Sequence, residues 1–443
     1  MKIVLIITSS GDAYYCGNCF RDNLMAQALR KAGHQVVIMP IYLPLRQKEF
    51  QADTPLFFPA TSYYVGQKYY KDKPMPTWMK KLLGAQPLLD MAMSMAGTTT
   101  SDGMEDMTLS MITGEGTTFG GMVQEMIDWI LQKEKPDVVY VSSTMLVGIA
   151  KALKEQCEAL HMDCPKIVCM AQDEEVWIDG LRDADAEKAW QGISDNLRYS
   201  DAVITTSKYY KEKMLGLLPD SGRLPDIQVI YPGIETEKYV TDLHPLDPTI
   251  GFFYRMNHMD GLDILAEAFV ILKQKGTVPN LKLRIGGGYT SQDKKFLREV
   301  RKTLAPYRKD VVIEQKYDWE HHAEFYKRIS VICVPLRFDE SVGLYLLEAF
   351  AAGVPAVEPY TGSFNEIVDL GGLIYARNDA QTLAQSIEDL FLTPGLWRQL
   401  SADALKLAQG RYSSATMAKK LEEVIDNIDI KQQIINSLNT VRL

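Results

Sequence analysis

Short apolar runs alternate with helix-length segments along two separate stretches of the chain. The first stretch contains the runs KIVLIIT, HQVVIM, PDVVYV, PKIVCM, SDAVITT and IQVIYPG, and the pattern restarts with PTIGFFY, LKLRIGGG, DVVIEQ and SVICVPL. Strands that alternate with helices along a chain form a parallel sheet with helices on both faces. The sequence therefore predicts an α/β protein of two Rossmann-like, doubly wound lobes with a cleft between them.

The length of the chain, 443 residues, exceeds the usual size of one domain. A polar, proline-containing segment follows the last run of the first stretch and has the composition of a linker. We expect a first lobe over residues 1–232, a second lobe over 233–415 and a helical tail over 416–443. Residues 44–118 interrupt the alternation, so we interpret them as an insertion in the first lobe.

Composition and charge restrict the classes of function. With 46% hydrophobic and 24% charged residues, the composition is typical of a globular protein. A net charge of −9 argues against nucleic acid as a partner, because nucleic-acid binding needs a basic surface. The opening MKIVLIITSSGD reads as a buried strand rather than a signal peptide, and no apolar run reaches the length of a membrane span. The six cysteines form no disulfide framework, so we expect a cytoplasmic protein.

One carboxylate lies in a segment that otherwise reads as a buried helix. Glu348 is the only charged residue in SVGLYLLEAFAAGVPAV. A buried carboxylate needs a partner, and two explanations stay open: an ion pair or hydrogen bond within the core, or a bound ligand. Glu340 precedes the helix, beside the amides of residues 342–345, where a helix N-terminus attracts an anion. Together the two acids suggest a nucleotide sugar, with its phosphate on the amides and its hydroxyls on the acids.

The segment ESVGLYLLEAFAAGVPAV resembles the E-x7-E signature of family-4 glycosyltransferases. These are retaining enzymes with two Rossmann-like lobes, the GT-B fold. The spacing of the acids, the GLYLLEA core, the following AAGVPAV and the later TGSFNEIV match the family in order. The resemblance implies a glycosyltransferase that moves a hexose from a nucleotide-sugar donor, UDP- or GDP-linked, with no permanently bound cofactor and no obligatory metal.

The resemblance also implies roles for individual residues. Glu340 would contact hydroxyl groups of the donor sugar, and Glu348 the ribose. Arg255, which follows the first strand of the second lobe, matches an arginine that faces the donor diphosphate, so Arg255 and Glu340 are the expected catalytic residues. The remaining expected contacts with the donor come from a helix N-terminus, a glycine turn and the loop after the first strand: Ser341, Val342, Gly343, Leu344, Gly287, Gly17 and Asn18.

The sequence departs from the family pattern at several positions. Asp260 stands where the family has a lysine that faces the diphosphate, and nearby His258 is a candidate substitute. Ser363 and Asn365 replace a usual glycine and proline. The histidine that many members carry in the first lobe has no counterpart beside Gln172, so we assign no general base.

A CxxC pair, Cys16 and Cys19, lies in the loop and helix start after the first strand. A helix N-terminus lowers the pKa of a thiol, which is typical of redox sites. A zinc site would need a second pair of ligands. We favour a packing or loop-shaping role for this pair over a redox role.

The motifs do not identify the acceptor of the sugar, and residues 66–96 provide the clue to it. This segment is rich in lysine and aromatic residues, and Trp78, Leu82, Leu89 and Met93 recur at helical spacing. The pattern suits an interfacial helix that touches a membrane from the cytoplasmic side, or a helix packed on the first lobe. If the segment touches a membrane, we expect a lipid or a lipid-linked glycan as acceptor.

Two other functions stay open. A sugar-nucleotide hydrolase or epimerase can be built on the same two lobes, and sugar release without an acceptor would favour it. A catalytically silent nucleotide-sugar-binding protein would retain both glutamates and bind the donor without turnover.

Overall fold

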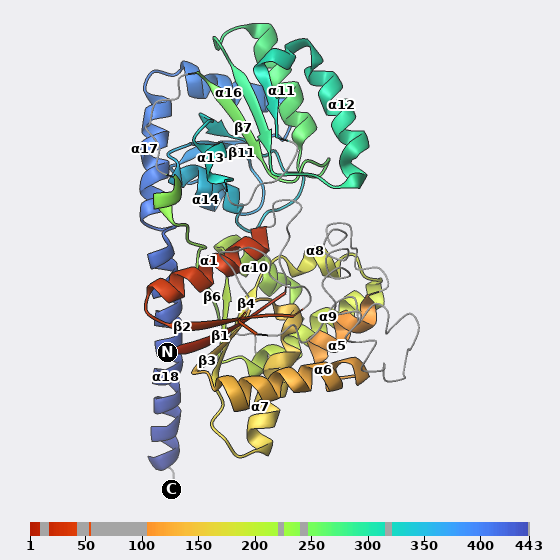
Figure 1. The fold of residues 1–443 in the computed structure, drawn as a ribbon, viewed down its shortest axis with the longest axis vertical. Helices are drawn as coiled ribbons and strands as arrows, with labels where there is room; N and C mark the ends of the chain where they lie inside the picture. Colours follow the sequence, from red (N-terminus) through yellow and green to blue (C-terminus); the bar gives the residue numbers. More distant parts are fainter. Residues whose placement is uncertain are drawn as a thin grey trace. The chain divides into compact units, whose positions relative to one another are not determined.

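The computed structural model describes residues 1–8, 17–41, 53–54, 104–219, 226–239, 247–314 and 321–441. The chain divides into two compact units (Figure 1). Unit 1 comprises Met1–Ser10, Asn18–Ile230 and Met417–Leu443, and unit 2 comprises Gly11–Gly17 and Tyr231–Thr416.

Unit 1 is built on a parallel sheet of six strands in the order β2-β1-β3-β4-β5-β6. The strands are buried almost throughout because both faces are covered by helices, which explains their continuous apolar sequences. The strands are β1 (Lys2–Ile7), β2 (Gln35–Pro40), β3 (Val138–Val141), β4 (Lys166–Ala171), β5 (Ala202–Thr205) and β6 (Ile227–Val229). The principal helices are α1 (Gly17–Lys31), α5 (Glu105–Thr113), α6 (Thr117–Asp128), α7 (Gly148–Ala159), α8 (Glu174–Ile178), α9 (Asp183–Asn196) and α10 (Lys208–Leu217).

Unit 2 contains a second parallel sheet, in the order β12-β11-β10-β7-β8-β9. The predicted α/β fold of two Rossmann-like lobes is thus confirmed. The strands are β7 (Thr249–Phe253), β8 (Lys282–Gly286), β9 (Val311–Ile313), β10 (Val331–Ile332), β11 (Ala356–Pro359) and β12 (Gly372–Tyr375). The helices are α11 (Leu262–Lys275), α12 (Lys294–Leu304), α13 (Ala323–Tyr326), α14 (Leu344–Ala351), α15 (Phe364–Ile367), α16 (Ala380–Leu392) and α17 (Leu396–Gln409).

The strand orders place a topological switch point in each sheet. In unit 1 the chain goes from β1 outward to β2 and returns on the other side at β3; in unit 2 it leaves β7 for β8 and returns at β10. In open parallel sheets, ligands bind outside the carboxyl ends of the strands at such a point. Polar side chains on the loops after β1, β3, β7 and β10 are therefore candidates for ligand contacts.

The long C-terminal helix α18 (Ser414–Val441) is grouped with unit 1 from Met417 onward. Its Glu422 lies 2.7 Å from the ring of His34, at the corner between α1 and β2. Its Asp429 accepts a hydrogen bond from Lys166 at 2.6 Å. The segment that we expected to be a separate tail is thus held on the first sheet by polar contacts.

The end of the predicted insertion, residues 44–118, has regular structure. Helix α5 lies within it, and α5 buries Met111 and Ile112 in the core of unit 1. The described end of this segment is therefore helical, and its apolar residues belong to the core of unit 1. Residues 66–96, on which the expected membrane contact rests, lie outside the described part of the chain.

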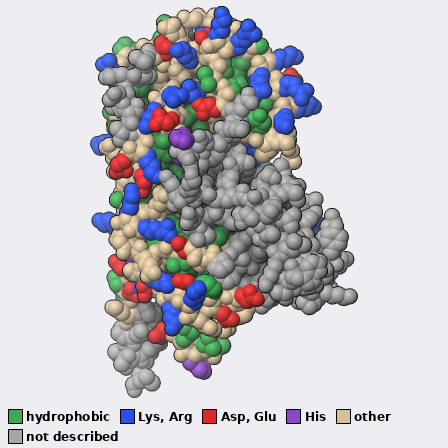
Figure 2. Space-filling view, viewed as in Figure 1, with side chains coloured by type: hydrophobic (Ala, Val, Ile, Leu, Met, Phe, Trp, Pro, Cys, Tyr) green, Lys and Arg blue, Asp and Glu red, His purple; other side chains and the backbone are tan. Residues whose placement is uncertain are grey.

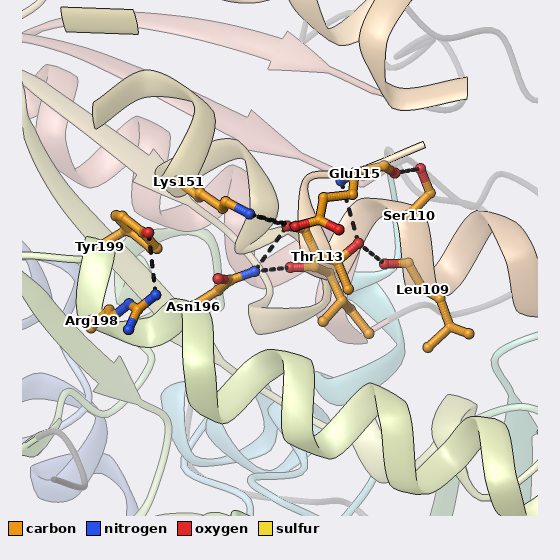
Figure 3. Close-up of polar contacts among 9 residues, drawn as sticks. Leu109, Ser110, Thr113, Glu115, Lys151, Asn196, Arg198 and Tyr199 are labelled. Carbon is orange, nitrogen blue, oxygen red and sulfur yellow. Dashed lines mark hydrogen bonds and ion pairs between the residues drawn. The ribbon is translucent and has the colours of Figure 1, made fainter. Parts of the chain in front are cut away.

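A network of polar contacts joins the end of α5 to α7 and α9 (Figure 3). The Asn196 amide donates to the carbonyl groups of Ile112 and Thr113, at 2.8 and 3.1 Å. Lys151 pairs with Glu115 at 2.9 Å. These groups satisfy carbonyls that a helix end leaves without an intrahelical partner.

Basic side chains gather on α12 and the turn that follows it (Figure 2). The helix buries Leu297, Val300 and Leu304 and directs its charged residues outward. The exposed cations are Lys294, Lys295, Arg298, Arg301, Lys302, Arg308 and Lys309. Within the described ranges, no helix is both long and apolar enough to span a bilayer.

Candidate functional site

Arg255 follows β7 and is held by the glycine turn after β8. The amide of Tyr254 donates to the Gly286 carbonyl at 3.3 Å, and the amide of Met256 donates to the Gly288 carbonyl at 2.9 Å. Gly287 has φ +105°, and a Cβ atom there would lie 2.2 Å from the Tyr254 carbonyl oxygen. Only glycine fits such a position, so the three glycines fix the backbone that carries Arg255.

The guanidinium group of Arg255 is oriented by a polar turn. Its Nη2 atom donates to Thr290 Oγ1 and to Asp293 Oδ2, each at 3.3 Å. Thr290 and Asp293 form a capping box, so their side chains are themselves fixed. The sequence TSQD carried this capping signal, although we did not single it out.

Glu340 lies after β10, next to Arg255's strand in the sheet order. Its carboxylate accepts a hydrogen bond from the Tyr254 hydroxyl at 2.9 Å and one from the Val342 amide at 3.3 Å. The neighbour of Arg255 thus orients Glu340. No sequence signal pointed to Tyr254, because the contact joins residues 86 positions apart.

The backbone of Glu340 is positioned by the TGSFNEIV loop. A Cβ atom on Gly362, which has φ +51°, would lie 2.5 Å from both the amide nitrogen and the carbonyl oxygen of Glu340. The Ser363 amide donates to the Glu340 carbonyl at 2.9 Å. Glu366 accepts a hydrogen bond from Tyr231. The TGSFNEIV loop, which matches the family pattern, therefore contacts the main chain of a candidate site residue.

Helix α14 begins at Leu344, with Gly343 at its N-cap in the left-handed region, φ +71°. Ser341 and Val342 are buried, at 2% and 3% exposed. The Val342 amide, which we expected to face the diphosphate, donates to Glu340 in this structure. A bound anion at this helix N-terminus would share that amide with the Glu340 carboxylate.

Asp260 is a buried acid beside these groups. It is 3% exposed, and its backbone amide donates to Asn257 Oδ1 at 2.9 Å. Burial raises the pKa of the Asp260 carboxyl group to about 8; Arg255 acts to lower it, and Glu340 and Asp293 raise it further. Its Oδ2 atom has no hydrogen-bond partner within the described ranges. The carboxyl group is therefore mostly protonated at neutral pH, so it is a hydrogen-bond donor rather than an anion.

His258, the candidate substitute for the family's lysine, lies beside Asp263 and Phe296. Its ring is 3.9 Å from Asp263 and makes an edge contact with Phe296. Asp263 is in turn held by two hydrogen bonds from Arg337, at 2.8 and 2.7 Å.

Glu348 is fully buried and has protein partners. It accepts hydrogen bonds at 2.8 Å from the hydroxyl groups of Tyr239 and Tyr326, and the His322 ring lies 2.7 Å away. The described contacts match the first of the two explanations, a polar network within the core, so the burial of this acid is accounted for without a ligand. A carboxylate can accept about four hydrogen bonds, so a contact with ribose is compatible with this network and remains a proposal.

Of the expected first-lobe residues, the structure describes Gly17 fully. Gly17 starts α1 and is grouped with unit 2, and a Cβ atom there would meet nothing within 4 Å. The side chains of Asn18 and Cys19, and the whole of Cys16, lie outside what the structure describes. Among the described residues, no group of three His, Cys, Asp or Glu side chains has the arrangement of a metal site.

The family model described as Glycosyl transferases group 1 matches residues 247–392, which include Arg255, Glu340 and Glu348. The chain is 25% identical over 203 residues to the lipopolysaccharide core biosynthesis mannosyltransferase LpsB of Rhizobium meliloti, covering 41% of this chain and 56% of that protein. It is 29% identical over 195 residues to the D-inositol 3-phosphate glycosyltransferase of Pseudarthrobacter chlorophenolicus, covering 42% and 45%. These alignments thus span about half the length of each relative.

Solved structures extend the similarity to both units. The sucrose-phosphate synthase of Thermosynechococcus elongatus has a TM-score of 0.67 at 16% identity, covering 98% of this chain and 99% of that one. Anabaena HepE in complex with UDP and glucose has a TM-score of 0.62 at 15% identity, covering 96% and 99%. At such low identities the likeness shows the fold alone. The fold is the two-lobed GT-B architecture of glycosyltransferases.

Proposed function

We propose that the protein is a glycosyltransferase that transfers a hexose from a nucleotide-sugar donor and retains the configuration of the sugar. The observation that carries this proposal is the convergence of Arg255, Glu340 and the N-terminus of α14 at the switch point of the unit 2 sheet. An anion there would meet a guanidinium group and helix amides, while a sugar would meet a carboxylate.

In this proposal, Arg255 and the amides of Val342, Gly343 and Leu344 stabilise the charge that develops on the leaving diphosphate. Glu340, with Ser341 beside it, binds hydroxyl groups of the sugar, and the Tyr254 hydroxyl keeps its carboxylate in place. Glu348 contacts the ribose, and Gly287 gives the nucleotide close access to the β8 turn. Protonated Asp260 donates a hydrogen bond to a donor oxygen, which partly replaces the family's lysine.

The donor is expected to carry UDP or GDP. UDP is the first choice because HepE, a structural neighbour, is solved in complex with UDP-glucose. The acceptor is a lipid or a glycan, with Gly17 and Asn18 near the reacting centre. The expected cytoplasmic location and the membrane contact through residues 66–96 belong to the same proposal.

A thermal-shift panel of UDP, GDP, ADP and CMP with their common sugar conjugates tests the donor. A ligand at 100 times its dissociation constant should stabilise the fold by about 2.7 kcal/mol. One nucleotide series should shift the wild type and shift Glu340→Gln less for the sugar conjugates. No shift with any nucleotide would contradict the proposal, and binding without any transfer or hydrolysis would favour the silent nucleotide-sugar-binding protein.

A further inference from the structure

A group of buried polar side chains lies at the carboxyl edge of the unit 1 sheet. Helix α1 contributes Arg21, Asp22 and Asn23, which are 4%, 3% and 1% exposed. Ser142 follows β3 and Gln172 follows β4, and the Gln172 amide donates to the Ser142 carbonyl. These residues surround the switch point between β1 and β3, where open parallel sheets bind ligands.

Several of these side chains are left unsatisfied. Within the described residues, Arg21 Nε and Nη2, Asp22 Oδ1, Asn23 Oδ1, Ser142 Oγ and Gln172 Oε1 have no hydrogen-bond partner. Buried polar groups in folded proteins are almost always paired, and unpaired donors of a charged group are especially costly. The donors among these atoms are Arg21 Nε, Arg21 Nη2 and Ser142 Oγ, and their presence at one sheet edge indicates a ligand with acceptor oxygens.

The charges of the cluster favour an anion. Burial raises the pKa of Asp22 to about 7, against the lowering effect of the neighbouring Arg21 guanidinium group. Asp22 is therefore only partly ionised at neutral pH and does not neutralise Arg21 fully. Glu174, another buried acid near this edge, is already bonded: its carboxylate accepts hydrogen bonds from the Ser143 hydroxyl at 3.1 Å and from the Thr144 amide at 2.9 Å.

We propose that Arg21 and Ser142 bind a phosphate group of the acceptor in unit 1. A guanidinium group presents a planar set of donors that matches phosphate oxygens, and a serine hydroxyl adds a further donor. The assignment of this phosphate to the acceptor rests on the proposed function, because a donor site in unit 2 leaves the unit 1 switch point to the second substrate. The substrate class is thus a phosphorylated sugar, polyol or lipid.

Inorganic phosphate is the probe that tests this site in the full-length protein. Calorimetric titration is done against the wild type, Arg21→Met and the matched control Arg308→Met, which removes an exposed arginine after α12. Each titration is done with and without the nucleotide that the donor panel identifies, at saturation and constant ionic strength. Phosphate should bind the wild type and Arg308→Met with the nucleotide present, and bind Arg21→Met at least tenfold more weakly.

Nucleotide affinity should be equal in all three proteins. Should Arg21→Met fail to fold, Ser142→Ala replaces it, with an expected loss of about threefold to tenfold in phosphate affinity from one lost hydrogen bond. The proposal is overturned if phosphate binds no better than chloride, if acetate matches phosphate, or if phosphate competes with the nucleotide. If phosphate binds at Arg21 but no nucleotide binds at all, the anion pocket stands while the proposed function and the acceptor assignment fail.

Discussion

Gly362 lies directly against the main chain of Glu340: a Cβ atom on Gly362 would be 2.5 Å from both the amide nitrogen and the carbonyl oxygen of that glutamate. The Gly362→Ala variant must therefore move Glu340 or the loop. We expect a loss of about tenfold in affinity for the donor sugar, measured by calorimetric titration. Gly395→Ala is the matched control, because Gly395 also has a positive φ but has nothing within 4 Å of the added Cβ. Equal affinities in the two variants would show that the Glu340 backbone is not part of the site.

Asp260 makes stability depend on pH. Its pKa is about 8 in the folded protein, against an ordinary value of 3.8, so the folded state holds a proton that the unfolded state loses. Stability therefore falls as pH rises from about 4 to 8 through this group. Asp260→Asn removes the cost of ionising the buried acid. We expect its melting temperature, relative to the wild type, to be higher at pH 9 than at pH 5.

Asp263→Asn is the opposite case. Burial acts to raise the pKa of Asp263, but the hydrogen bonds and positive charge of Arg337, together with a backbone amide and the nearby His258, leave the pKa below its ordinary value. This variant should lower the melting temperature above pH 5, where the wild-type carboxylate is ionised and paired. If both asparagine variants change stability equally at every pH, Asp260 does not hold a proton in the folded state.

Two variants of Glu348 distinguish a role in stabilising the fold from a role in binding a ligand. Glu348→Ala removes the carboxylate that accepts from the hydroxyls of Tyr239 and Tyr326 and lies beside the His322 ring. We expect it to cost about 2–4 kcal/mol of unfolding free energy. Glu348→Gln retains one acceptor oxygen and should cost less. Urea unfolding measures both. If Glu348→Gln weakens nucleotide binding at least tenfold while losing under about 1 kcal/mol, the ribose contact is supported; unchanged binding would assign Glu348 to the core alone.

The contact between α5 and α7 depends on glycine. A Cβ atom on Gly148 would lie 2.5 Å from the Gly114 nitrogen and from the Met111 carbonyl oxygen. Gly148→Ala should therefore destabilise unit 1 by about 1–3 kcal/mol. Gly216→Ala, inside α10 with nothing within 4 Å, should instead stabilise the protein by about 0.5–1 kcal/mol. Thermal unfolding of both variants checks the opposite signs, and a stabilised Gly148→Ala would contradict the described packing.

The sequence alone predicts the fold because strand-length apolar runs alternate regularly with helix-length segments. Every apolar run that we singled out contains a strand, from Lys2–Ile7 to Val331–Ile332. The short strands Ala356–Pro359 and Gly372–Tyr375 were not singled out, because neither forms an apolar run that stands apart from its flanking residues. Helix α5 was not singled out for a different reason: its polar and methionine-rich sequence resembles that of the residues before it in the chain.

The sequence predicts site residues that lie close together in the chain, but not the contacts between segments that are far apart in it. The spacing of Glu340 and Glu348 placed both acids around one helix, and the structure keeps them there. The partners of these acids come from distant segments: Tyr254 for Glu340, and Tyr239 and Tyr326 for Glu348. A single sequence carries no signal for such pairs, since any buried tyrosine satisfies the pattern. The unsatisfied Arg21 was likewise invisible in the sequence.

Arg255 provides the most direct test of the donor site. The measurement is calorimetric titration of the wild type, Arg255→Gln and the exposed control Arg308→Gln with the nucleotide that the panel identifies. A charge-assisted bond to a diphosphate is worth about 1.5–3 kcal/mol, so Arg255→Gln should bind at least tenfold more weakly while Arg308→Gln matches the wild type. Equal affinity in all three proteins would contradict a diphosphate site at the unit 2 switch point.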